Sequence, residues 1–218
     1  MELVTVERGE QLYPVGQTID YAYFPQTALV SLVGLTTDGQ GTEVGMVGDE
    51  GFLGVPILFG AVTQQYAATI QVGGSLWKLP KDVIVDMKND DSPFINTLHL
   101  YATVRLTQLV QSAICNRFHT LKQRLCRWLL TVADRIGRDD LELTQEFLSQ
   151  MIGARRPAVA VTMGRLQRKG FLSCKRGHIV LQQRQALEAV TCECYEIVNR
   201  GLRNFLNARN LPMVRAQE

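Results

Sequence analysis

The residues with the clearest chemical character in this chain form a run of cations between residues 147 and 187. The run contains eight Lys and Arg side chains and no Asp or Glu. Phosphate groups release their counterions to Lys and Arg side chains that no carboxylate neutralises, so such a run suits a polyanion. A solvated charged face is the commoner explanation when charge alone is considered. The cations are Arg155, Arg156, Arg165, Arg168, Lys169, Lys175, Arg176 and Arg184.

The elements that must position these cations favour nucleic-acid binding over a solvated face. Thr144 can cap a short helix that ends at Gly153, where glycine permits a left-handed turn. A second helix is expected over about 156–169, and the stretch 171–181 is typical of two strands joined by a tight turn. Two helices followed by a hairpin form a winged helix-turn-helix, whose second helix enters the major groove. Duplex DNA is therefore the expected partner.

Charge is divided unevenly along the chain. Residues 1–114 carry five basic and 12 acidic side chains, whereas residues 115–218 carry 18 basic and nine acidic ones. The net charge of +2 thus hides an acidic half, suited to sensing or assembly, joined to a basic half. The length allows two domains of about 100 residues each. No apolar run reaches the roughly 18 residues that a membrane span needs, and no signal peptide is apparent, so a cytoplasmic protein without membrane contact is expected.

The five cysteines are an odd number, and cytosolic chains keep thiols reduced, so no disulfide framework is expected. Cys192 and Cys194 lie too close together, and too far along the chain from other ligands, for the paired sets of a zinc site. Buried or partly exposed thiols are the simpler interpretation. A redox or metal sensor built on Cys192 and Cys194 is the alternative. We expect no metal and no cofactor.

The first half of the chain has the pattern of a β domain. Residues 19–35 are dense in Tyr, Phe, Val and Leu, and the strand pattern resumes over 42–47 after a turn at 37–41. Short strands with glycine corners at this spacing indicate a barrel or jelly roll. Metal-dependent enzymes of that fold need two or three histidines on facing strands, but His99, His119 and His178 all fall outside the barrel. We expect no enzyme and assign no catalytic residue.

From about Ser92 the periodicity becomes helical. Ser92 can cap a helix of about 25 residues with proline in its first turn. Its apolar positions step by four or three, which favours a dimer interface with a second helix, the alternative being packing against the barrel. These apolar positions, here called the seam, are Leu98, Ala102, Leu106, Leu109 and Ala113. Further helices are expected over 121–136 and over about 184–208.

The order of barrel, long helix, connecting helix and winged helix-turn-helix resembles the cyclic-AMP receptor/fumarate–nitrate reduction regulator (Crp/Fnr) superfamily of bacterial transcription factors. Residues 9–12, 23–25 and the glycine pattern over 38–54 carry the same resemblance. It implies an α+β, two-domain fold: an N-terminal cyclic-nucleotide-binding-like β jelly roll, a long dimerisation helix and a C-terminal winged helix-turn-helix. The expected boundaries are 1–91, 92–118 and 119–182, with a C-terminal helical extension over 183–218.

The resemblance also implies a homodimer that binds a two-fold related site on double-stranded DNA, with recognition helices about 34 Å apart. Arg156 falls where the family places a base-reading arginine, and Thr144 where it places a phosphate-contacting threonine. Pro157 and Val161 replace two further base contacts, so the familiar half-site is not expected and Val161 could at most meet a thymine methyl. The expected DNA-binding residues are Thr144, Arg155, Arg156, Val161, Arg165, Arg168, Lys169, Lys175, Arg176 and His178.

Control by cyclic AMP is not expected, because Phe52 and Tyr66 replace the glutamate and the arginine that hold the nucleotide in the family. Either the barrel is only a scaffold for dimerisation, or it binds a different, unknown small-molecule effector. RNA polymerase is a further candidate partner. The alternative function is a barrel-dimer interaction module whose helix-turn-helix contacts a protein rather than DNA. The candidate effector pocket consists of Phe52, Leu53, Gly54, Tyr66 and Ala67.

Overall fold

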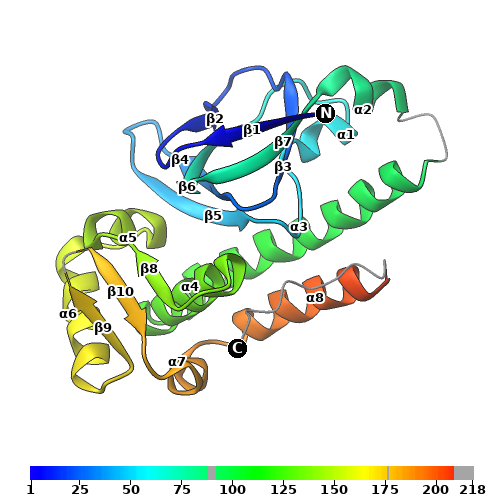
Figure 1. Cartoon of the computed structure of the whole chain (residues 1–218). Coiled ribbons are helices and arrows are strands. Elements are labelled where there is room, and N and C mark those ends of the chain that lie inside the picture. Colours follow the sequence, from blue (N-terminus) through cyan, green and yellow to red (C-terminus); the bar gives the residue numbers. More distant parts are fainter. Residues whose placement is uncertain (88–91, 176, 209–218) are drawn as a thin grey trace.

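The computed structural model describes residues 1–87, 92–175 and 177–208. Figure 1 shows a β-rich N-terminal lobe, a long helix beneath it, and a helical C-terminal lobe with a small sheet. This arrangement confirms the expected α+β, two-domain fold. Among the described residues, no helix combines the length and the apolar content that crossing a bilayer requires.

The N-terminal lobe consists of two antiparallel sheets with the strand orders β1-β7-β3 and β2-β6-β4-β5. Leu32 on β4 pairs with Gly45 on β5 and with Ala68 on β6, so β4 lies inside its sheet. The expected hairpin turn joins β4 to β5. The elements are β1 Glu2–Val6, β2 Gln11–Tyr13, β3 Tyr21–Pro25, β4 Leu29–Leu35, β5 Gly41–Val47, α1 Val55–Leu58, β6 Tyr66–Val72, β7 Gly74–Pro80 and α2 Lys81–Met87.

The long helix α3 (Pro93–Phe118) starts after Ser92, with proline in its first turn as the sequence predicts, but the Ser92 side chain makes no capping hydrogen bond. The expected seam, however, does not lie on one exposed face. Leu98 and Ala102 are buried in the core of the barrel, whereas Leu106, Leu109 and Ala113 are exposed. The prediction of one continuous seam is therefore wrong, because the N-terminal half of α3 also closes the barrel.

The C-terminal lobe begins with α4 (Leu121–Ile136), capped by Thr120, whose hydroxyl accepts from Gln123 N–H. Its core-facing side chains are buried as expected. The small sheet has the order β8-β10-β9, of which β8 is an element that the sequence pattern did not predict. The remaining elements are β8 Asp140–Glu142, α5 Gln145–Ile152, α6 Arg156–Arg168, β9 Leu172–Lys175, β10 His178–Leu181, α7 Arg184–Val190 and α8 Cys194–Ala208.

The C-terminal extension is two helices rather than the single helix expected, because the chain bends between α7 and α8 at residues 191–193. After this bend, α8 runs back along α3 (Figure 1). Phe205 on α8 packs against Tyr101 on α3, with ring centroids 5.8 Å apart. Together with Leu202 and Leu206, it belongs to the same apolar core as the barrel.

Several polar contacts fix the barrel against the C-terminal lobe. The indole Nε1 of Trp128 on α4 donates to Glu43 on β5 over 2.9 Å. Arg135, near the end of α4, forms a buried ion pair with Glu50, with Nε and Oε1 3.0 Å apart. Thr42 Oγ1 donates to the carbonyl of Met151 on α5 over 3.2 Å. Helices α4 and α5 are therefore held by the barrel as well as by the core of the C-terminal lobe.

Candidate DNA-binding surface

The turn between α5 and α6 has the geometry that the sequence predicts. Thr144 is exposed, and its Oγ1 accepts from Phe147 N–H over 3.2 Å at the start of α5. Gly153 ends α5 with φ of 61°, in the left-handed region that favours glycine. These two residues set the position of α6 relative to α5.

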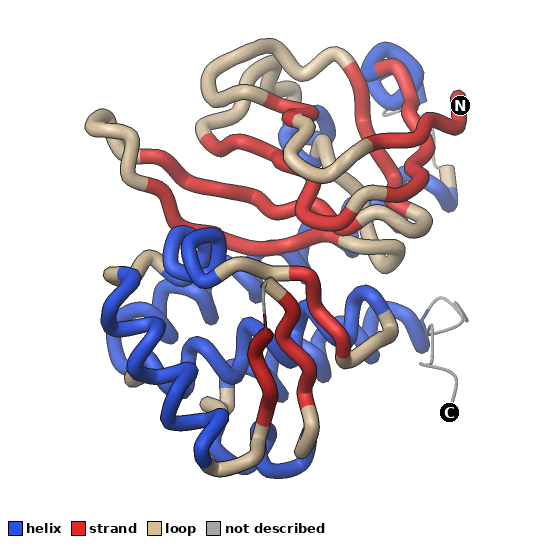
Figure 2. Tube along the Cα trace, turned by 60° about the vertical axis from the view of Figure 1, so that its left-hand side comes forward, coloured by secondary structure: helices blue, strands red, loops and turns tan. Residues whose placement is uncertain are grey.

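Helix α6 buries one face and exposes the other, because apolar residues recur at helical spacing. Val159, Met163 and Leu166 are buried in the C-terminal core. Arg155 is the N-cap residue and Arg156 the first residue of the helix, with proline next, where its missing N–H has little effect. Figure 2 shows α6 along the outer edge of the lobe, beside the small sheet. The expected DNA-binding residues exposed on and just before α6 are Arg155, Arg156, Val161, Arg165 and Arg168.

The hairpin adds a second group of polar side chains. Lys175 on β9 pairs in register with His178 on β10, and both side chains are exposed. Lys169, which follows α6, is exposed as well. Arg176, the remaining expected contact, lies outside the described residues.

Carboxylates reach this surface from outside the basic run, which the linear sequence conceals. Glu146 on α5 pairs with Arg156, with Oε2 and Nη1 2.9 Å apart on exposed side chains. Asp140 on β8 lies beside His178, with Oδ1 and Nδ1 3.6 Å apart. The expectation that no carboxylate neutralises the cations of the run is therefore wrong at Arg156 and also at Arg184. Glu146 and Asp140 were missed because one precedes the run and the other lies on the unpredicted β8.

Arg184 does not belong to this surface although it belongs to the basic run. Its guanidinium forms ion pairs with Asp134 on α4, with Asp139 at 3.2 Å and with Glu188 at 3.2 Å. Burial lowers the pKa of Arg184, but Asp134 and Tyr195 together raise it by more than burial lowers it. The net pKa is therefore higher than usual, and Arg184 is a permanent cation. Arg184 thus joins α7 to α4 rather than facing solvent.

The five residues of the candidate effector pocket are mostly packed into the barrel core. Phe52, Leu53 and Ala67 are buried, and Tyr66 is half-buried. The ring of Phe52 stacks on Phe24 and also contacts Tyr101 from α3, with centroids 5.5 Å apart in both pairs. Gly54 has φ of 111° at the start of α1. Phe52 thus packs between the barrel and α3.

Tyr101 comes closest to the turn where the family holds a nucleotide. A Cβ at Gly51 would lie 2.0 Å from the Tyr101 hydroxyl oxygen, so only glycine fits there. The nearest cation on α3 is Arg105, which is buried and donates to the carbonyl of Met46 over 3.2 Å and to Gln108. A nucleotide at this turn would therefore have to displace the Tyr101 ring, and its phosphate would have to compete with Met46 and Gln108 for Arg105.

The comparison with protein families identifies one domain. Residues 123–190 match the model of the Crp-like helix-turn-helix domain. The match spans α4 to α7 and contains each of the expected DNA-binding residues. A search of curated protein sequences finds no match.

Solved structures extend the similarity to the whole fold. A transcriptional regulator of the CRP/FNR family from Thermus thermophilus is 23% identical, with a TM-score of 0.74 over 87% of this chain and 97% of that one. FixK2 from Bradyrhizobium japonicum is 17% identical, with a TM-score of 0.75 over 88% of this chain and 97% of that one. The fold expected from the resemblance is confirmed.

Proposed function

We propose that this protein is a homodimeric DNA-binding transcriptional regulator, because residues 123–190 are a Crp-like helix-turn-helix domain within a chain that has the fold of the Crp/Fnr regulators. It recognises a two-fold related site through α6 and is not controlled by cyclic AMP. The observation that carries the proposal is the exposed face of α6, where arginines and Val161 project from a helix whose other face is locked into the core. RNA polymerase and an unidentified small effector remain candidate partners.

The proposed dimer interface is the C-terminal half of α3, from Leu106 to Phe118. This half exposes a stripe of large apolar side chains on the face opposite buried Gln108 and Cys115. Exposed apolar residues at i, i+4 spacing on a long helix are typical of a helix–helix interface. A second copy of the same helix would cover them with a self-complementary surface. The stripe consists of Leu106, Val110, Ile114 and Phe118.

In the proposed complex, the first turn of α6 faces the base edges. Arg156 can grip O6 and N7 of guanine with two hydrogen bonds, which is worth about 1–3 kcal/mol of discrimination. Its ion pair with Glu146 is exposed on both sides, and such pairs contribute at most about 1 kcal/mol, so DNA can displace the carboxylate. Lys175 and His178 would contact the backbone from the hairpin.

The first test selects bound fragments from random duplex DNA and then measures the affinity of Arg156→Ala for the selected site. We expect the variant to lose preference at one base pair in each half-site, with roughly 10- to 100-fold weaker specific binding. Binding to random DNA should persist and weaken steeply between about 50 and 200 mM salt.

The matched control is Arg200→Ala, which removes an exposed arginine from α8, outside the proposed surface. It should leave the selected motif and the affinity unchanged. If Arg156→Ala lowers affinity for specific and random DNA equally, Arg156 does not read a base. If no duplex binds even at low salt, the protein-interaction alternative replaces the proposal.

A further inference from the structure

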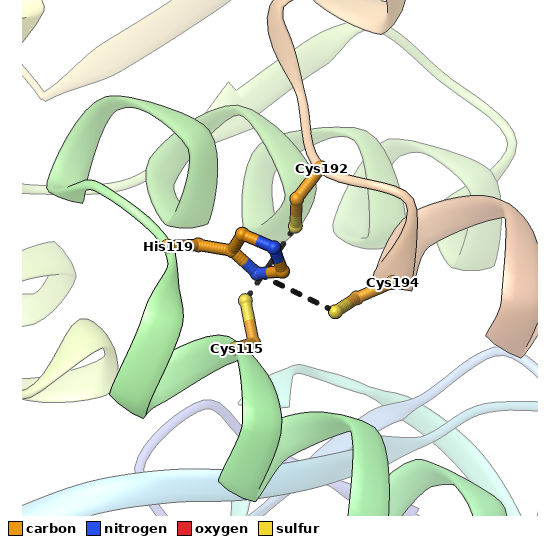
Figure 3. Close-up of side chains that lie close together, drawn as sticks. All are labelled: Cys115, His119, Cys192 and Cys194. Atoms are coloured by element: carbon orange, nitrogen blue, oxygen red, sulfur yellow. Dashed lines mark hydrogen bonds between the residues drawn. The ribbon is translucent and has the colours of Figure 1, made fainter.

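Four potential metal ligands converge where the end of α3 meets the bend between α7 and α8. Cys115 lies in the last turn of α3, and His119 follows that helix. Cys192 lies in the bend, and Cys194 is the first residue of α8. Figure 3 shows the four side chains pointing toward one another from these two segments. Folding thus brings together two pairs of ligands that lie more than 70 residues apart along the chain.

The distances between the ligand atoms suit one small ion. Cys115 Sγ and Cys192 Sγ are 3.6 Å apart, and Cys194 Sγ and His119 Nδ1 are also 3.6 Å apart. All four ligand atoms lie within 4.8 Å of one another. A tetrahedral zinc ion with Zn–S bonds of about 2.3 Å separates its sulfurs by about 3.8 Å. The side chains are therefore already arranged close to the four corners of a zinc site.

The imidazole of His119 is oriented as a metal ligand requires. Its Nδ1 faces Cys194, while its Nε2 lies 3.2 Å from Oε1 of Glu193. A carboxylate that accepts from one ring nitrogen leaves the other nitrogen unprotonated and directed at the metal. Glu193, between the two cysteines in the sequence, thus holds the ring while its neighbours supply sulfur.

Burial and charge also fit a metal with thiolate ligands. All three cysteines are buried and form a cluster of their own, apart from the two large cores. A divalent ion with three thiolates and one neutral imidazole carries one net negative charge. The guanidinium of Arg127, on α4, lies beside Cys115 and supplies the opposite charge. A buried anionic site with an adjacent arginine is better stabilised than one without a counterion.

We propose that Cys115, His119, Cys192 and Cys194 bind a single structural zinc ion. Three sulfurs and one nitrogen are one of the usual ligand sets of closed, four-coordinate zinc sites. An iron–sulfur cluster would place several irons and sulfides between its cysteines, for which these ligand atoms are too close together. The interpretation of Cys192 and Cys194 as isolated thiols is therefore replaced, because α3 supplies the two missing ligands.

The ion would act on the angle between the long helix and the DNA-binding lobe. His119 directly precedes Thr120, which caps α4, so the site lies at the elbow between α3 and α4. The same ion would hold the bend from which α8 returns along α3. Zinc would thus link the junction of α3 and α4 to α8. It would thereby fix the angle between α3 and α4, and with it the position of the helix-turn-helix.

The test measures metal in the full chain purified without oxygen and without chelators. We expect mass spectrometry of the metals to find about one zinc ion per chain. Cobalt added to the metal-free chain should give the visible bands of tetrahedral cobalt with thiolate ligands. X-ray absorption of the zinc form should fit three sulfurs at about 2.3 Å and one nitrogen at about 2.0 Å.

Two substitutions give a matched comparison. Cys194→Ser should lose the zinc and the cobalt bands, whereas Cys174→Ser, a half-buried cysteine on β9, should retain both. If Cys194→Ser fails to fold, the cobalt titration and the X-ray absorption of the unaltered chain still decide the question. Chelation should lower the melting temperature of the unaltered chain, and added zinc should restore it.

Several results would overturn the proposal. These are a chain that remains metal-free after zinc is added, zinc that persists in Cys194→Ser, a brown protein that contains iron, or a Cys115–Cys192 disulfide in place of the metal. None of these measurements involves DNA, so the site can fail while the proposed regulatory function stands, and the reverse also holds.

Discussion

Burial of the Glu43 side chain has a direct consequence for how the stability of the protein depends on pH. It lies on β5 next to α4, where Trp128 Nε1 donates to Oε1 over 2.9 Å and Ser31 Oγ lies 2.8 Å from Oε2. Burial raises the pKa of Glu43 to about 7, although its hydrogen bonds oppose the shift. Ser31 has one hydroxyl proton and also contacts Gln71 Oε1 at 2.7 Å. A protonated Glu43 can donate to Ser31, which then donates to Gln71.

The raised pKa makes stability depend on pH in a predictable direction. Between about pH 4.5 and 7 the folded protein keeps the Glu43 proton, whereas the unfolded chain releases it, so the free energy of unfolding falls as pH rises. The loss is roughly 3 kcal/mol at most and is complete above pH 7. Denaturant titrations at several pH values measure it.

Glu43→Gln is the matched variant, because an amide keeps both hydrogen bonds but does not ionise. The variant should lack this part of the pH dependence and be the more stable protein above pH 7. If unaltered chain and variant lose the same free energy between pH 4.5 and 7, Glu43 is not the responsible group.

Residue-level prediction from sequence succeeded where the signal is local. The capping role of Thr144 and the left-handed turn at Gly153 depend on neighbours within a few positions. It failed where tertiary packing decides. The proximity of Cys115 to Cys192 and the ion pair between Glu146 and Arg156 both require the helices to be placed in space.

At the scale of elements, α3 has two different apolar faces, one for its own chain and one that is open. Leu98 and Tyr101 pack in the barrel core, whereas Val110 and Phe118 are exposed in the C-terminal half of the helix. Periodicity detects a helix by the difference between one apolar face and one polar face. Because α3 has two apolar faces, this difference is small, and the positions of both faces were assigned to a single seam. The expected bounds of α4, 121–136, agree with the structure, and the start of α3 was predictable because Ser92 and Pro93 are typical of a helix start.

The open face provides the test of the dimer. Val110→Glu places a charge in the proposed interface and should convert the dimer to the 24.4 kDa monomer. The variant should also bind a two-fold site more weakly than the unaltered chain, since it loses the linkage between two half-sites. Analytical ultracentrifugation measures the mass.

Val62→Glu is the control, because Val62 on the barrel surface is 60% exposed and Val110 is 56% exposed. It should remain dimeric. A dimer that survives Val110→Glu would mean that another surface of the chain joins the two copies.

At the scale of the whole molecule, α3 closes the barrel with Tyr101 where a nucleotide would have to bind. Phe52 and Tyr101 occupy this space in the described structure, and Tyr101 lies so close to Gly51 that a Cβ there would be 2.0 Å from the hydroxyl oxygen. We therefore expect calorimetry with cyclic AMP to show no saturable binding at micromolar concentrations. The same sample should bind its selected DNA site, which shows that it is active. A clear micromolar isotherm would contradict the proposed independence from cyclic AMP.

The fold as a whole was predictable in its order of elements but not in how α8 packs. The strand pattern over 19–47 and the helices α4, α5 and α6 have local signals. The return of α8 along α3 has none, because its apolar face could have covered any other surface. The return places residues 202–206 against elements that precede them by about 100 positions in the sequence.

This return also bears on how the protein is made. Leu202, Phe205 and Leu206 leave the ribosome after the other members of the core into which they pack. The nascent N-terminal lobe therefore has an incomplete apolar surface until α8 is synthesised. A chain shortened by premature termination or by proteolysis before α8 would keep its DNA-binding helices but expose that surface, and so be directed to chaperones or degradation.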